Sequence, residues 1–126
     1  MLIFREFEAG PDPFGRKYHV LFKWLQTAIS LRHSDTVDVK FILQPEDGDP
    51  LEKTVALPHA LLAAAARENG RELDDAFSAR VAMLHLKQQI ETGEDIEKEL
   101  VTVLPADLRR HVDAIVRMEK AELQAR

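Results

Sequence analysis

Histidines are the residues of this sequence best suited to acid–base or metal chemistry near neutral pH, because imidazole titrates there and binds metals. The chain has five, and no two of them have the i, i+4 spacing of a helical metal pair: His19, His33, His59, His85 and His111. His33 lies close to Asp35 and Asp38 in an expected turn, and an imidazole with two carboxylates can hold a divalent cation. Aspartate is also an ordinary turn former. A plain turn is therefore the simpler interpretation, and a metal site at these three residues is a secondary hypothesis.

A row of basic side chains is the second candidate site. Its expected members lie on one face of an expected sheet: Lys17, His19, Lys23, Arg32 and Lys40. Such a face can bind an anionic ligand or a nucleic acid. Asp38 reduces the positive charge, and Trp24 is expected on the opposite face. A solvated sheet face is the simpler interpretation of the row.

Several kinds of catalytic site are missing from the sequence. The chain has no cysteine, which excludes disulfides, thiolate metal sites and a cysteine nucleophile. It has no glycine-rich phosphate loop and no G-x-S-x-G elbow. Asp47, Gly48 and Asp49 resemble the start of a calcium loop, but Pro50 and Leu51 break the ligand spacing. Nothing selects a general acid or base, so an enzyme is not favoured.

The elements that position these side chains begin with strands. Alternating apolar residues predict strands over 2–7, 36–43 and 52–57. In the segment 17–33, Tyr18, Val20 and Phe22 alternate with polar residues, and the alternation shifts after Trp24. We interpret the shift as a β-bulge or a break between two strands. A helix remains the rival interpretation, because Leu21, Leu25, Ala28 and Arg32 also form a helical stripe.

Helices are predicted in the second half of the chain. An alanine-rich segment after Pro58 favours a helix that stops at Asn69-Gly70. Asp74 or Asp75 can cap a second helix that ends at Thr92-Gly93. The apolar segment 100–104 stays ambiguous, and Pro105 opens a last helix.

One part of the chain resembles a known family. TVALP at 54–58 precedes an expected helix, ENGR at 68–71 forms a turn, and a second helix follows. Over residues 52–90 this order resembles the Arc-type ribbon-helix-helix repressors. The resemblance implies DNA contacts from alternate strand positions, here Glu52, Thr54 and Ala56. In that family the strand pairs with a second chain and no sheet precedes it, whereas here at least two expected strands do.

These patterns predict a single α+β domain over residues 1–126, mainly strands in 1–57 and mainly helices in 58–126. The expected sheet is an N-terminal antiparallel meander of three to four strands, one of them bulged or split. Two to three C-terminal helices should cover it.

The function we expect is that of a non-enzymatic interaction or accessory module, acting as a homodimer through its sheet face or its last helix. The alternatives are a DNA-binding regulator of ribbon-helix-helix type and a small-ligand or metal-binding protein. No cofactor is expected. The formal net charge of −5 does not favour a nucleic-acid partner. The sequence has no apolar run near the ~18 residues of a membrane span and no secretion signal, so a cytoplasmic protein is expected.

Overall fold

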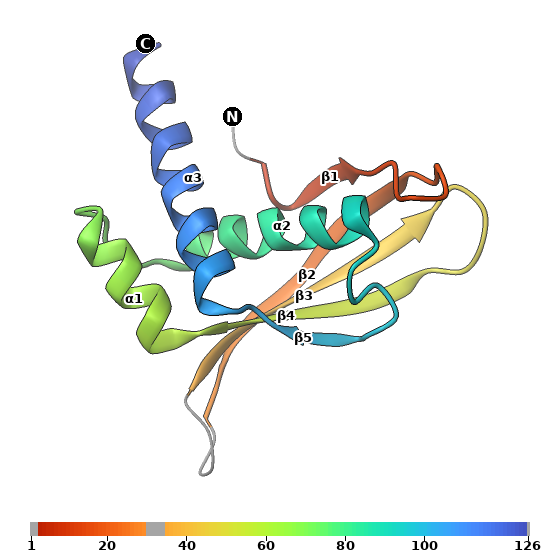
Figure 1. The fold of residues 1–126 in the computed structure, drawn as a ribbon, viewed down its shortest axis with the longest axis horizontal. Coiled ribbons are helices and arrows are strands. Elements are labelled where there is room, and N and C mark those ends of the chain that lie inside the picture. The colour runs from red at the N-terminus through yellow and green to blue at the C-terminus, as the bar shows by residue number, and fades with distance from the viewer. Residues whose placement is uncertain (1–2, 30–34, 126) are drawn as a thin grey trace.

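The computed structural model describes residues 3–29 and 35–125 and shows an α+β fold (Figure 1). Strands fill the first half of the chain, and helices follow. The elements in chain order are β1 (Glu6–Ala9), β2 (Tyr18–Ala28), β3 (Thr36–Pro45), β4 (Leu51–Pro58), α1 (His59–Glu68), α2 (Asp75–Thr92), β5 (Leu100–Thr102) and α3 (Pro105–Gln124). The predicted order of a sheet followed by helices is therefore confirmed.

The sheet has five strands in the order β1-β2-β3-β4-β5. The first four form the predicted antiparallel meander. The fifth, β5, pairs in parallel with β4 and comes from the segment whose structure the sequence left open. Parallel neighbours need a long crossover connection. Here the connection from β4 to β5 contains α1 and α2, and no local sequence pattern predicts that these two strands pair. The first strand also differs in its bounds, since it covers Glu6–Ala9 where the sequence predicted 2–7.

Strand β2 is one bulged strand and not a helix. Phe22 pairs with Phe41, but the next pair in register joins Trp24 to Lys40, so Lys23 is the extra residue. The bulge turns Trp24 to the same face as Lys40. The prediction that Trp24 points away from the basic row is therefore wrong, because the alternation shifts one residue earlier than expected.

All three helices lie on one side of the sheet (Figure 1). Helix α2 crosses this covered face and contacts β1, β3 and β4, while α3 packs against α1 and α2. Phe41 from the sheet and Phe77 from α2 are both fully buried in the shared core. Burying such a ring contributes roughly 1.5–3 kcal/mol.

Local signals set the ends of α2. The side chain of Asp74 accepts a hydrogen bond of 2.7 Å from the backbone N–H of Phe77, so Asp74 is the N-cap. Gly93 ends the helix in the left-handed conformation at φ 75°. A Cβ at that position would lie 3.0 Å from the ring of Pro13, which adds a close approach to the need for glycine.

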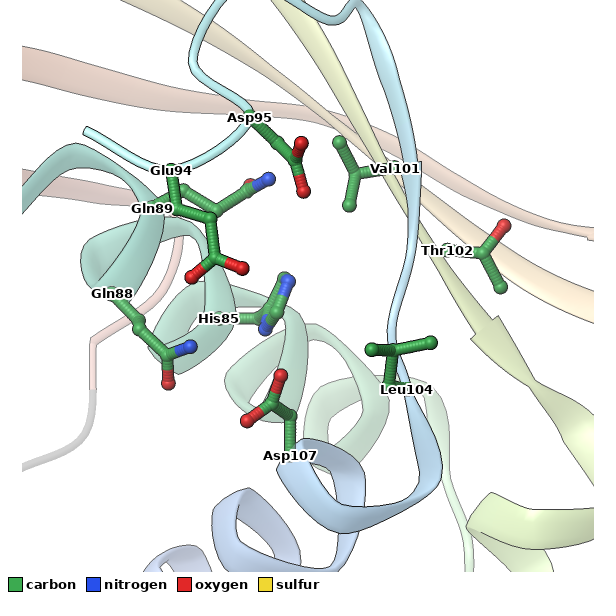
Figure 2. Close-up of a pocket in the computed structure, with 9 residues that line it drawn as sticks. All are labelled: His85, Gln88, Gln89, Glu94, Asp95, Val101, Thr102, Leu104 and Asp107. Carbon is green, nitrogen blue, oxygen red and sulfur yellow. The ribbon is translucent and has the colours of Figure 1, made fainter. Parts of the chain in front are cut away.

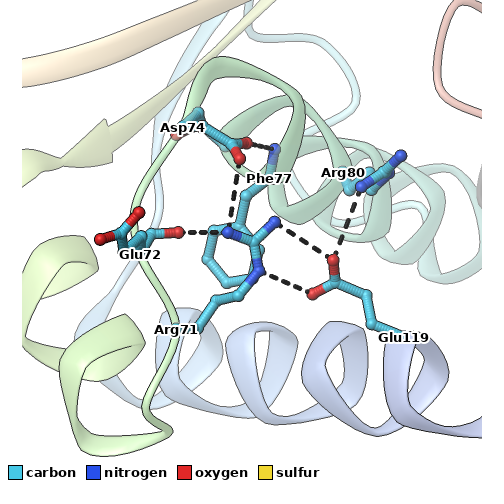
Figure 3. Close-up of polar contacts among 7 residues, drawn as sticks. Arg71, Glu72, Asp74, Phe77, Arg80 and Glu119 are labelled. Carbon is cyan, nitrogen blue, oxygen red and sulfur yellow. Dashed lines mark hydrogen bonds and ion pairs between the residues drawn. The ribbon is translucent and has the colours of Figure 1, made fainter. Parts of the chain in front are cut away.

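Arg71 ties the α1–α2 connection to α3 (Figure 3). Its Nε and Nη2 donate to the two carboxylate oxygens of Glu119 at 3.1 and 3.2 Å, and its guanidinium stacks 4.8 Å from the centre of the Phe77 ring. Nη1 lies 3.3 Å from Asp74, and Arg80 approaches Glu119 at 3.7 Å. A planar guanidinium suits this two-pronged contact better than an ammonium would. We therefore assign this cluster a structural role.

Candidate functional site

The open face of the sheet, opposite the helices, is the larger candidate site. Strand alternation places Leu21, Trp24 and Ile42 at its centre. No described helix covers this face, and Leu21 is 40% exposed. Leu100 on β5 lies beside Thr54 on the same face and is 58% exposed. This surface thus combines an aromatic ring and aliphatic side chains in one layer, which is typical of protein contact surfaces.

The structure brings three of the predicted basic residues onto this face: His19, Lys23 and Lys40. Lys17 lies just before β2, and Arg32 falls outside the described residues. His19 is held between two carboxylates of β1, with 2.7 Å from Nδ1 to Glu8 and 2.7 Å from Nε2 to Glu6. The hydrogen bond to Glu8, together with that to Glu6, raises the pKa of His19 above its usual value. The imidazolium is thus favoured here, but it is matched by acidic neighbours.

Glu52 bridges the other two cations of the row and offsets one of their two positive charges. Its carboxylate lies 2.8 Å from Nζ of Lys23 and 2.7 Å from Nζ of Lys40. The hydrogen bonds from Lys23 and Lys40 lower the pKa of Glu52 to about 2. Lys40 also sits 5.5 Å from the centre of the Trp24 ring, within the range of a cation–π contact. The row is therefore a set of ion pairs around an aromatic ring, and these acidic partners were missing from the sequence interpretation.

The residues implied by the ribbon-helix-helix resemblance lie on β4. Glu52 is ion-paired as described, Thr54 is half-buried, and Ala56 is 3% exposed. Strand β4 is paired with β3 along one edge and with β5 along the other, both in the same chain. The family's strand instead pairs with a second chain.

The predicted metal residues are not brought together by any contact that the structure describes. His33 lies outside the described residues. Asp38 accepts a hydrogen bond of 2.8 Å from the hydroxyl of Thr36, and the backbone carbonyl of Asp35 accepts one of 2.9 Å from the N–H of His59. Within residues 3–29 and 35–125, no group of three or more histidine or acidic side chains is arranged to hold a metal ion.

A second candidate site is a polar cavity between the end of α2, the α2–β5 loop and the start of α3 (Figure 2). It has a volume of about 30 Å³. Its lining is polar at one end and apolar near β5, and comprises His85, Gln88, Gln89, Glu94, Asp95, Val101, Thr102, Leu104 and Asp107. The α2–β5 loop is anchored by Lys53, whose Nζ donates to the carbonyls of Asp95 at 2.7 Å and Ile96 at 2.9 Å. The cavity wall is therefore fixed to the sheet.

Two buried histidines lie beside this cavity. Nδ1 of His85 and Nε2 of His111 are 3.1 Å apart and share a hydrogen bond, so at least one ring must be neutral to accept it. Burial lowers the pKa of His85. Burial and the neighbouring His85 lower the pKa of His111 to about 4. Both rings are therefore neutral at physiological pH.

The sequence interpretation missed this cavity. His85 and His111 are far apart in sequence, and only the packing of α2 on α3 joins them. A signal did exist, because His85 and Gln89 lie one helical turn apart among the apolar residues of α2. Polar residues inside a buried stripe point to a structured polar site.

Three comparisons with known proteins complete this picture. No family model, no curated protein and no solved structure matches the chain. Among the described residues, no helix is both long enough and apolar enough to cross a membrane.

Proposed function

We propose that this protein is a non-enzymatic interaction module that forms a homodimer through the open face of its sheet. The observation that carries the proposal is the apolar and aromatic centre of that face, formed by Leu21, Trp24 and Ile42, with no described helix over it. Trp is among the residues that most often dominate binding energy at protein interfaces. Cytoplasmic residence belongs to the same proposal, since a chain without cysteine suits a reducing compartment.

The size of the open face supports a second copy as the occupant. Strands lie about 4.8 Å apart and rise about 3.3 Å per residue, so five strands, the longest of 10 or 11 residues, span roughly 24 Å by 33 Å. Because β1 and β5 are short, the usable area is on the order of 600 Å². Stable complexes bury about 600–1,000 Å² on each partner, so face-to-face packing of two sheets reaches the lower end of that range.

The charges on the face also favour self-association. The three cations of the face, protonated His19, Lys23 and Lys40, are balanced as a set by three carboxylates, those of Glu6, Glu8 and Glu52. A two-fold dimer places the same patch against itself, so a patch with a strong net charge of one sign would repel its copy. Internal ion pairing removes most of that repulsion. It also weakens the case for a nucleic-acid ligand on this face, because phosphate binding depends on uncompensated cations.

Light scattering after size exclusion tests the proposal. The wild-type chain should elute as a dimer at micromolar concentration and dissociate on dilution. Leu21→Lys should give a monomer with unchanged circular dichroism, because a charge at the centre of the face would be buried without a partner. Leu123→Lys is the matched control, since Leu123 is 69% exposed near the end of α3.

Two results would contradict the proposal. One is a wild-type chain that stays monomeric at high micromolar concentration. The other is a dimer that Leu123→Lys dissociates and Leu21→Lys does not, which would assign the interface to the last helix.

A further inference from the structure

Gln89 is the most informative residue of the polar cavity. Its side chain is 2% exposed, and neither its Nε2 nor its Oε1 has a hydrogen-bond partner among the described residues. Its carboxamide lies between Glu94 and Asp95 at the cavity (Figure 2). A buried amide without partners is costly, and native proteins nearly always satisfy such groups with protein, water or a ligand. We therefore expect the cavity to hold a small group that forms hydrogen bonds with the Gln89 amide.

The other polar groups around the cavity are mostly acceptors. Glu94 is an exposed residue of the lining, and its carboxylate forms no ion pair among the residues that the structure describes. The neutral ring of His85, which extends from α2, lies between the carboxylates of Glu94 and Asp107 (Figure 2). Three carboxylates line the wall, those of Glu94, Asp95 and Asp107. The last two also bind cations of their own, with 3.1 Å from Asp95 to Lys98 and 2.7 Å from Asp107 to Arg110.

The volume of the cavity and the charge of its lining restrict which ligand it can hold. A cavity of about 30 Å³ holds one or two molecules of the size of water. An anion is disfavoured by the carboxylates. A multivalent metal would need several ligands converging on one point, and no such group occurs in the described part of the chain. An ammonium group has the size of a water molecule, carries one positive charge and donates several hydrogen bonds to acceptors that need not surround it closely.

We propose that this cavity binds ammonium or the primary ammonium group of a small amine. The group donates to Oε1 of Gln89 and to the carboxylate of Glu94, and Nε2 of His85 is a further acceptor in the tautomer whose Nδ1–H donates to His111. The proposal is independent of the sheet-face dimer, because it rests on the opposite side of the sheet.

Titration with ammonium chloride and methylammonium chloride, followed by ¹⁵N–¹H NMR of the full chain, tests this inference. The side-chain NH₂ signal of Gln89 should shift and saturate, and the melting temperature should rise with the same midpoint. Tetramethylammonium chloride at equal ionic strength is the control ion, since it is too large for the cavity and has no N–H to donate. Equal shifts with this control would show a general salt effect and overturn the proposal.

Variants then locate the site. Glu94→Gln should weaken ammonium binding roughly tenfold. Glu91→Gln is the matched control, because Glu91 carries the same charge near the end of α2 but does not line the cavity. Gln89→Leu removes the NMR reporter itself, so its readout is the melting temperature, which should no longer rise with ammonium; leucine is similar in size and leaves no unpaired polar atom.

Three outcomes would overturn the inference. The first is a side-chain NH₂ signal of Gln89 that does not shift at high ammonium concentration, which would mean that the cavity holds only water. The second is the same midpoint in the wild type and Glu94→Gln. The third is a saturable response to Mg²⁺ or Ca²⁺ without one to ammonium, which would indicate a metal site.

Discussion

Buried histidines show how strongly a single residue's surroundings decide its chemistry. The sequence contains five histidines, and their spacing does not indicate which of them have unusual pKa values. In the folded chain His19 lies at the surface between two carboxylates, and its pKa is raised. His85 and His111 are buried against each other, and their pKa values are lowered. The same side chain thus favours opposite protonation states at two places in one small protein.

The lowered pKa of His111 predicts a loss of stability in mild acid. Its pKa is 6.5 unfolded and about 4 folded, so between these values the unfolded chain binds the additional proton. The stability that the neutral ring contributes is complete above pH 6.5 and is lost as the pH falls towards 4. The total is about 3 kcal/mol. Urea unfolding at a series of pH values should show this slope, and His111→Leu should flatten it. An equal slope in the variant would show that other groups, such as Asp107, account for the acid sensitivity.

At the scale of elements, caps and breakers in the sequence correctly placed the helix ends. Pro105 occupies the first turn of α3, Gly93 ends α2, and Asn69 ends α1 just before Gly70. These signals work from sequence because each involves residues within a few positions of one another. A bulge in β2 was one of the alternatives that the sequence left open, and the shift in alternation was expected one residue too late, because alternation alone does not identify which residue is unpaired.

The capping of α2 provides a test at this scale. The sequence offered Asp74 or Asp75 as the cap, and the structure selects Asp74. Asp74→Ala should lower the free energy of unfolding by about 1 kcal/mol, since it leaves the N–H of Phe77 without a partner. Asp75→Ala, which removes an equal charge one position later, should cost less, about 0.5 kcal/mol from the helix dipole alone. Denaturant unfolding of both variants measures the difference, and equal losses would rule out a specific cap.

For the whole molecule, the two faces of the sheet have different roles. One face is closed by α2 and supports the core, and the other remains open and carries the ion-paired residues around Trp24. Antiparallel sheets tolerate one solvated face, so openness by itself proves nothing. The proposal of a dimer rests instead on the apolar centre, the area and the internal charge pairing of that face.

Charge pairing on the open face predicts how the proposed dimer should respond to the loss of the Glu52 carboxylate. Glu52→Gln leaves Lys23 and Lys40 without their carboxylate, so two like-charged patches would meet in the dimer. We expect the dissociation constant to rise roughly threefold to tenfold at low salt, and to recover partly at high salt because ions screen exposed charges. Sedimentation equilibrium at two salt concentrations measures both effects. Glu46→Gln changes the charge equally in the β3–β4 turn and should leave the constant unchanged. A dimer indifferent to Glu52→Gln would place the interface elsewhere.

The amino-acid sequence alone determined the α+β class, an antiparallel meander of three to four strands and the main helix boundaries, while the structure decided that residues 18–28 form one bulged strand. Each of the features determined by sequence follows from alternation, propensity or capping over short distances along the chain. Tertiary structure alone decided the parallel addition of β5, the pairing of Lys23 and Lys40 with Glu52, and the contact of His85 with His111. These depend on contacts between residues far apart in sequence, and the register of a sheet or the packing of two helices fixes such contacts only once the chain has folded.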